Sequence, residues 1–367
     1  MKSEKKADLS QYHYTSMNES YKLQLFDSFA KLYNRSFNKM ERYSKFQLFK
    51  LNLKAIDDLN IESRQNGGVE VNGITKFADT SRYDFLKYFL GCNMIDESDA
   101  IVTDRVEQYR GEKLRVDWTD TLTTHVNDQG RCGCSWAYAI SQQVETDAIR
   151  AGLLTRDDSL STEQILRCSR ANHGHNKGNI IDAYKYVALN GMERAQDYPK
   201  NPSGAKVCNA SESLFIVSIS SLFVLNDNDP LRYFATELSM RDYLLSTGPL
   251  TTVVDASNWA FYNGQGIFMN CPQIPHLNHA VQIVGVNLED PWNSYWIVRT
   301  HSIPLALLAP LIYTAHLPNS FLTSSRLNFT DPDHTLKLNL LVGWLLSRCA
   351  VRGVRTSVPA GTSTSPI

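Results

Sequence analysis

Residues 128–138 combine thiol, hydroxyl and amide side chains directly before an expected helix. They read Asp-Gln-Gly-Arg-Cys-Gly-Cys-Ser-Trp-Ala-Tyr. A thiol at a helix N-terminus has its pKa lowered by the helix dipole and by an adjacent imidazolium. A side-chain amide and a backbone N–H can stabilise the oxyanion that a nucleophilic attack creates. The segment thus carries groups that covalent acyl transfer needs, and a histidine from elsewhere in the chain must act as the base.

The elements that must position these groups are expected after residue 116. A helix over 135–151 has an apolar stripe and ends before Gly152, a second begins at Ser161 with a capping-box pattern, and a third covers 180–189. The later apolar runs are strand-like and cover residues 215–219, 250–254, 280–286 and 295–298. Helices first and strands afterwards predict an α+β body with two unlike halves.

The preceding residues form a different part of the chain. Residues 21–90 are predicted to be largely helical, with a short strand over 71–79. Six residues share one helical face at 100° per residue, and spacing alone favours a mixed amphipathic helix. They are Glu41, Lys45, Phe49, Asn52, Ile56 and Asn60. Residues 91–115 are polar without a clear period, which indicates an exposed, cleavable linker.

Composition narrows the classes of partner. The 367 residues allow two or three domains, and 43% hydrophobic with 20% charged residues exclude wholesale disorder. Lys+Arg 37 against Asp+Glu 38 gives a net charge of −1, so no nucleic-acid partner is expected. No apolar stretch is long enough for a membrane span, and no signal peptide is visible at the N-terminus.

Residues 128–138 resemble the active-site signature of the papain-like cysteine peptidases, Gln-Gly-x-Cys-Gly-Ser-Cys-Trp-Ala-Phe. Residues 116–118 resemble the family's mature start, 160–168 its second helix, 278–285 its catalytic-histidine strand and 295–299 the strand before its catalytic asparagine. His279 lies inside the ~130–150-residue window expected downstream of the nucleophile. The resemblance implies an α+β, papain-like two-domain fold, with a helical half and an antiparallel β-barrel half around a cleft.

The front of the chain resembles a helical pro-segment of the same family. The six-residue face is similar to its interspersed Glu-Arg-Phe-Asn-Ile-Asn motif, with Lys45 replacing arginine. A second motif, Gly-Asn-Phe-Asp, is matched by Gly73, Phe77 and Asp79, with Thr75 replacing asparagine. The resemblance implies a cathepsin-L-type cysteine endopeptidase proenzyme whose own pro-segment fills the cleft until the linker is cut. The implied division is 1–20 unstructured, 21–90 pro-segment, 91–115 linker, 116–300 truncated peptidase domain and 301–367 a divergent tail.

The resemblance also assigns roles to single residues. Gln129 takes the position of the oxyanion glutamine, Ser135 that of the nucleophile, His279 that of the catalytic histidine and Thr300 that of the orienting asparagine. The substrate-binding positions are matched by Asn176, Gly178, Asn278 and Trp136. A peptide or protein substrate, a monomer, no cofactor and a lysosomal or extracellular location are implied.

Two catalytic positions depart from the family pattern. Ser135 stands where the family has cysteine, and a hydroxyl forms no stable ion pair with an imidazolium near neutral pH. Cys134 is one residue early, roughly 100° around the helix, so we expect it to point away from His279. Thr300 lacks the reach of an amide. We therefore expect catalysis to be impaired.

The seven cysteines are expected to pair only in part. Cys168 and Cys208 match one family disulfide. His175 replaces the family partner of Cys132, so Cys132 is expected to be unpaired. Cys271 lies where another family disulfide begins. The close histidine pairs lack a carboxylate cluster, so no metal site is expected.

Three hypotheses about function remain open from the sequence. The first is a working peptidase that uses His279 with Ser135 or a displaced Cys134. The second is a non-catalytic homologue that binds peptides or peptidases. The third is a mispredicted gene model of an active cathepsin, because the chain after Arg299 reads Thr-His-Ser where the family has Asn-Ser-Trp-Gly. Peptide hydrolysis that depends on His279, and the transcript around codon 299, distinguish them.

Overall fold

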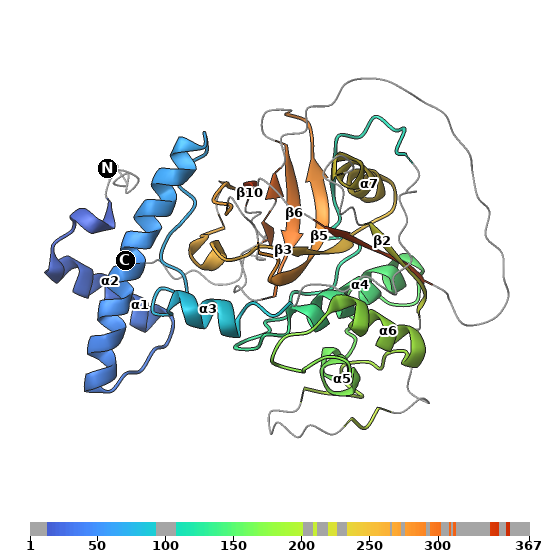
Figure 1. Ribbon diagram of the computed structural model, residues 1–367, viewed down its shortest axis with the longest axis horizontal. Helices are drawn as coiled ribbons and strands as arrows, with labels where there is room; N and C mark the ends of the chain where they lie inside the picture. Colours follow the sequence, from blue (N-terminus) through green and yellow to red (C-terminus); the bar gives the residue numbers. More distant parts are fainter. Residues whose placement is uncertain are drawn as a thin grey trace, which may run out of the picture.

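The structure, a computed structural model, comprises a helical N-terminal domain packed against a larger body of helices and strands (Figure 1). Helix α3 lies between the two parts, and its buried Phe85 belongs to an apolar core shared with the body. The described residues are 13–92, 108–200, 208–210, 219–225, 233–264, 266–272, 276–290, 294–301, 308–309, 311–312, 338–344 and 350–352.

The N-terminal domain is largely helical, as predicted from the sequence. Its elements are the 3-10 turn η2 (Tyr14–Ser16) and helices α1 (Glu19–Leu32), α2 (Lys39–Gln65) and α3 (Arg82–Tyr88). Asn38 and Glu41 form a capping box at the start of α2. A cluster of buried aromatic rings joins α1 to α2 and consists of Phe26, Phe29, Phe46 and Phe49. These rings form the apolar core of this domain.

Two expectations for this domain need correction. Residues 14–20 were expected to be unstructured, but η2 and the start of α1 lie there, because the Asp57 carboxylate accepts hydrogen bonds from the Tyr14 and Thr15 N–H groups. The strand expected over 71–79 is also wrong. Only an isolated bridge between Asn72 and Tyr262 is present, followed by a turn.

The predicted six-residue face of α2 holds the returning chain against the helix. Asn52 Nδ2 donates to the carbonyl oxygens of Ala78 at 2.9 Å and Thr80 at 3.0 Å. Lys45 Nζ donates to the Asp79 carbonyl at 2.8 Å. The polar members of the face therefore satisfy backbone groups of a segment that has no strand partner of its own.

The other members complete the same contact. Asn60 Nδ2 donates to the Asn72 carbonyl at 3.0 Å, and its Oδ1 accepts from the Asn72 N–H at 2.9 Å. Phe49 and Ile56 are fully buried between these polar positions. Polar side chains of this face therefore make specific contacts with residues 72–80, which a mixed amphipathic helix would not require.

Replacing Asn52 with alanine is expected to destabilise the full-length protein by about 2 kcal/mol, because two backbone carbonyls lose their donor. Urea unfolding of the full-length chain measures this change. Lys54→Ala on the same helix is the matched control, since its pair with Asp58 is exposed and contributes less than about 0.5 kcal/mol. Equal effects of the two substitutions would contradict the assigned role.

The helical half of the body consists of α4 (Ser135–Arg150), α5 (Thr162–Cys168) and α6 (Ile180–Asn190), close to the predicted bounds. Nearly all of α4 is buried, and it packs against strand β5. The Ser161 hydroxyl accepts from the Gln164 N–H and caps α5. This packing fixes the direction in which the N-terminus of α4 points.

The second half is built on a mixed sheet in the order β2-β9-β3-β5-β6-β7, with β1 also on β5. The strands are β1 (Arg115–Asp117), β2 (Ile219–Leu225), β3 (Leu250–Val254), β5 (His279–Asn287), β6 (Tyr295–Arg299), β7 (Leu308–Ala309) and β9 (Leu338–Trp344). A smaller sheet holds β4 (Ile267–Phe268), β8 (Leu311–Ile312) and β10 (Ala350–Arg352), and the remaining elements are α7 (Tyr233–Ser246) and η4 (Trp259–Phe261).

The α+β architecture is confirmed, with one difference in the sheet. The pairs among β1, β3, β5, β6 and β7 are antiparallel as expected, but β9 is parallel to both β2 and β3. Strands β7 and β9 come from the tail, so the tail supplies partners for both β6 and β3. The predicted strand residues 215–218 lie outside the described part of the chain. Among the described helices, none is long and apolar enough to cross a lipid bilayer.

Candidate active site

The N-terminus of α4 meets the beginning of β5. Ser135 is the first residue of α4, and its Oγ accepts a hydrogen bond from the Ala280 N–H at 3.2 Å. Ser135 and His279 are both fully buried. The structure therefore brings the predicted nucleophile position next to the residue that follows the predicted histidine.

His279, the predicted base, begins β5, and its predicted partner Thr300 directly follows β6. Its Nε2 lies 2.8 Å from Thr300 Oγ1, directly after β6, which pairs with β5. The Trp259 ring packs edge-on against the imidazole, with 6.1 Å between ring centroids. Burial lowers the pKa of His279 to about 3. The imidazole is neutral near pH 7 and is a weak base in this closed state.

Thr300 is positioned by a buried charge at the end of β6. Arg299 Nη2 donates to the carbonyl oxygens of Thr124 and His125, each at 2.7 Å. Burial lowers the pKa of Arg299 to about 10, while the buried Glu145 carboxylate opposes that shift. Sequence reasoning missed this network, because a lone arginine in an apolar strand gives no sign of its partners.

Gln129 contacts the N-terminal domain through the group expected to stabilise an oxyanion. Its Nε2 donates to the Cys132 carbonyl at 2.6 Å and to the Phe89 carbonyl at 3.0 Å. The Gln129 N–H donates to the His301 carbonyl at 2.9 Å. A backbone carbonyl of the N-terminal domain thus lies where we expect a substrate carbonyl.

The chain after Phe89 continues through the cleft between the two halves. The Gly91 carbonyl accepts from the Gly178 N–H at 3.1 Å, and the Cys92 N–H donates to the Asn278 carbonyl at 3.0 Å. A Cβ on Gly91 would lie 1.9 Å from the Gly133 carbonyl carbon, so this close approach requires glycine. Sequence reasoning placed these residues at a domain edge, and Gly91 is the signal that could have indicated the contact.

Two of the predicted substrate-binding residues, Gly178 and Asn278, contact this segment. Gly178 packs directly on Trp136, and a Cβ at 178 would lie 2.5 Å from the indole. Asn278 uses its side chain internally, since its Oδ1 accepts from the Ala256 N–H at 3.0 Å. Asn176 is exposed and forms a bridge with Gly133. Backbone groups of Gly178 and Asn278, together with the Gln129 side chain, make the contacts in the cleft.

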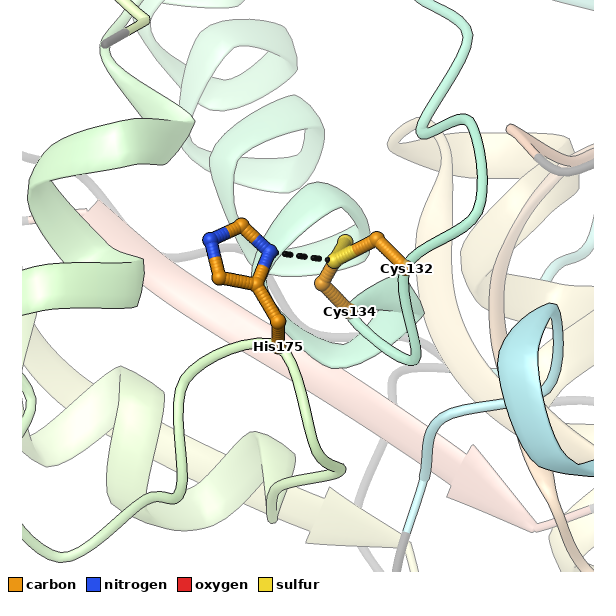
Figure 2. Close-up of side chains that lie close together, drawn as sticks. All are labelled: Cys132, Cys134 and His175. Atoms are coloured by element: carbon orange, nitrogen blue, oxygen red, sulfur yellow. Dashed lines mark hydrogen bonds between the residues drawn. A yellow bond between two sulfur atoms is a disulfide. The ribbon is translucent and has the colours of Figure 1, made fainter. Parts of the chain in front are cut away.

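The disulfides correct one prediction. Cys168 and Cys208 are bonded as expected, but Cys132 is bonded to Cys134 instead of being unpaired (Figure 2). The physical reason is proximity, because the two Cα atoms are 5.2 Å apart, within the usual range for a disulfide. The Cys134 sulfur is therefore held in a disulfide. Cys271 is also disulfide-bonded.

Cys92 is a further sulfur near the cleft. Its thiol is buried, and burial raises its pKa to about 12. Almost none of it ionises near neutral pH, so it does not serve as a nucleophile.

These observations define a class of protein: a two-lobed peptidase proprotein whose helical N-terminal domain sends its own chain through the cleft. The family model described as papain family cysteine protease matches residues 113–301, and the cathepsin propeptide inhibitor domain matches residues 26–85. The chain belongs to the papain family of cysteine proteases and carries the propeptide of its cathepsin-type proenzymes.

Individual relatives agree with this assignment. Cysteine proteinase 1 of Dictyostelium discoideum is 29% identical over 300 residues, covering 75% of this chain and 82% of the relative. Fruit bromelain of Ananas comosus is 30% identical over 266 residues, covering 71% and 70%. The structure of digestive procathepsin L 3 from the Tenebrio molitor larval midgut is 25% identical, with a TM-score of 0.63 over 77% of this chain and 90% of that one.

Proposed function

We propose that this proenzyme homologue has strongly impaired peptide hydrolysis. The observation that carries the proposal is the residue at the start of α4, where a serine hydroxyl replaces the family's thiol beside His279. Its proposed partners are Gln129 as the oxyanion donor and Thr300 as the orienting residue.

The chemistry explains the expected loss. Hydrolysis requires a nucleophile to bond to the substrate carbonyl carbon while its proton moves to the imidazole, which later protonates the leaving amine. A thiolate and an imidazolium stabilise each other before the attack, whereas a hydroxyl must lose its proton during it. In the closed proprotein, burial also lowers the pKa of His279 to about 3, so the imidazole is a poor acceptor for that proton until the pro-segment leaves.

The activity of the purified full-length protein tests the proposal, after a helper peptidase has cleaved between the pro-segment and Arg115 and been removed. Hydrolysis of a fluorogenic peptide is expected to remain at background and to be equal in the His279→Ala variant. Turnover that is lost in His279→Ala would refute the proposal, because it would show a working pair at positions 135 and 279. The released pro-segment is measured in parallel, so that a closed cleft is not taken for an inactive one.

A second function, binding without catalysis, is favoured by the contacts of the pro-segment. Gly91 and Cys92 occupy the cleft through backbone hydrogen bonds to Gly178 and Asn278, which require no catalytic group. We therefore propose that the cleft accepts a peptide or protein in extended conformation once the pro-segment has left. Binding of the isolated segment 86–92 to the cleaved protein would support this, and its absence would contradict it.

The proposed setting follows from the family and from the disulfides. Cathepsin-type relatives are typically lysosomal or secreted, and we propose the same location for this chain, acting as a monomer. The Cys168–Cys208 disulfide supports the location, because such bonds persist in oxidising compartments.

A further inference from the structure

A cluster of potential metal ligands lies beside the cleft, outside the proposed catalytic residues. Cys132 and Cys134 flank Gly133, and His175 approaches them from a neighbouring loop (Figure 2). The two sulfurs and an imidazole nitrogen all lie within 4.8 Å of one another. Cys132 Sγ is 2.8 Å from His175 Nδ1. The set was not predicted as a metal site, because the histidine lies 41 or more residues from either cysteine, although the resemblance places His175 at the position of the family partner of Cys132.

Backbone hydrogen bonds hold the histidine loop against the Cys-Gly-Cys turn. The Gly133 N–H donates to the His175 carbonyl at 3.0 Å, and the Lys177 N–H donates to the Gly133 carbonyl at 3.0 Å. A Cβ on Gly133 would lie only 3.2 Å from the His175 carbonyl oxygen. These bonds do not involve the sulfurs, so we expect them to keep His175 beside both cysteines when the disulfide is reduced.

We propose that Cys132, Cys134 and His175 form a redox-gated site for Zn²⁺, closed as a disulfide and open as a dithiol. Two thiolates and an imidazole are ligands that Zn²⁺ prefers, and such a three-ligand set leaves a fourth position for water. The proposal concerns the sulfurs that the hydrolytic reaction does not use, so it does not rest on the proposed function.

The reaction that opens the site balances as an exchange with a dithiol reductant. The reductant transfers two electrons and two protons to the Cys132–Cys134 bond and becomes a disulfide itself. Zn²⁺ then binds both sulfurs as thiolates, with release of two protons, while His175 Nδ1 donates its lone pair as the third ligand. The two thiolates neutralise the charge of the ion, so no other counter-charge is needed.

Two features of the turn favour this exchange. The disulfide closes a loop with a sequence separation of only 2, whereas Cys168–Cys208 has a separation of 40. A short loop constrains the unfolded chain less, so reduction of this disulfide removes less stability. Cys134 is also the N-cap of the 16-residue helix α4, where the helix dipole stabilises a thiolate.

The ion can reach the ligands from the side of the histidine. His175 is exposed, whereas Cys132 and Cys134 are 7% and 1% exposed. A bound ion would join the loop of His175 to the Cys132–Cys134 turn. The same loop carries Gly178, whose N–H donates to the Gly91 carbonyl. An oxidising compartment keeps the site closed, and contact with a dithiol reductant opens it.

Zinc binding to the oxidised and the reduced full-length protein tests the proposal. Competition with a chromogenic chelator is expected to show one Zn²⁺ per chain after reduction and none before it. Co²⁺ used as a probe is expected to give the near-ultraviolet thiolate-to-cobalt charge-transfer band in the reduced protein alone. His175→Ala is expected to weaken Zn²⁺ binding at least about tenfold.

Matched variants assign the ion to these ligands. His173→Ala removes another exposed histidine of the same loop and is expected to leave Zn²⁺ affinity unchanged. The Cys132→Ser/Cys134→Ser variant keeps the reduced Cys168 and Cys208 thiols and is expected to bind no Zn²⁺. If circular dichroism shows that this variant does not fold, the comparison of His173→Ala with His175→Ala tests the site instead. Both histidine side chains are exposed, so their replacement is expected to leave the fold intact.

Three results would overturn the proposal. The first is equal Zn²⁺ binding by oxidised and reduced protein, and the second is equal weakening by His173→Ala and His175→Ala. The third is loss of the native circular dichroism on reduction alone, because the loop that presents His175 would then no longer exist.

Discussion

The Ser135→Cys/Thr300→Asn variant is expected to hydrolyse a fluorogenic peptide at least about a thousandfold faster than the unaltered chain, once the pro-segment is cleaved away. Position 135 begins α4, so a thiol there gains the helix dipole and the imidazole of His279. An asparagine at position 300 restores an amide next to His279 Nε2, where Thr300 now offers a hydroxyl at 2.8 Å. The two substitutions act on one ion pair, so their effects are expected to be more than additive.

The single variants separate the two contributions. Ser135→Cys alone is expected to give weak turnover, because it supplies the nucleophile without the orienting amide. Thr300→Asn alone is expected to remain at background, since it orients an imidazole that has no thiol to activate. Peptide mass mapping checks that the new thiol has not displaced Cys134 from its disulfide with Cys132.

An inactive double variant would contradict this prediction and would place the fault in the tail. The match of this chain to the papain family model ends at residue 301. The strands beyond that point include β9, which is parallel to β3. A cleft that cannot hold substrate would then explain the loss better than the two side chains do. Substrate binding to the inactive variant, measured separately, distinguishes these explanations.

The elements around the site could be predicted because local pattern and packing agree there. The helix α4 packs against β5, and β3, β5 and β6 are largely apolar segments that are buried throughout. Ser135 contacts the beginning of β5, and His279 contacts Thr300 after β6, because these elements pack as the resemblance implied. The expected disulfide between Cys168 and Cys208 is present for the same reason.

The remaining features depend on contacts that no local pattern reveals. The alternation over 71–79 suggested a strand, but side chains of α2 such as Asn52 and Asn60 satisfy that backbone instead. Cys132 forms a disulfide with Cys134, two residues away. The prediction used only the disulfide positions of the family, which do not include this pair. Strand β9 joins the sheet from more than 80 residues beyond β3, and apolar character alone did not specify a parallel register.

Acid is expected to destabilise the protein through His279, and the sign follows from the direction of its pKa shift. Burial lowers the pKa from 6.5 to about 3, so between these values the unfolded chain binds a proton that the folded chain does not. The free energy of unfolding therefore falls as the pH falls from about 6.5 to about 3, by about 1.4 kcal/mol per pH unit from this residue.

Other buried groups modify the total slope, and His301 interacts electrostatically with His279 itself. His301 is also buried, and its pKa is lowered by burial and by the charges of Arg299 and His279, so it adds a slope of the same sign. Asp147 has a pKa that burial raises to about 6, and it contributes in the opposite sense. Trp259 and Thr300, which contact the imidazole, carry no charge in this range.

The His279→Gln variant isolates the contribution of one imidazole. Its curve of unfolding free energy against pH is expected to be flatter than that of the unaltered chain by about 1.4 kcal/mol per pH unit between pH 4 and 6. His276→Gln is the matched control, because His276 is exposed three residues earlier and its replacement is expected to leave the slope unchanged. Urea unfolding of the full-length chain at several pH values provides the curves.

The same shift links acid to opening of the cleft. His279 is fully buried, and Cys92 of the pro-segment side is hydrogen-bonded to Asn278 directly before it, so we expect departure of the pro-segment to give the imidazole access to water. Protonation below about pH 6.5 therefore favours the open state, and proteolysis between residues 92 and 115 is expected to accelerate in acid for the unaltered chain more than for His279→Gln. Parallel stability curves for the two proteins, or equal acceleration of cleavage, would show that the imidazole is not the group through which acid acts.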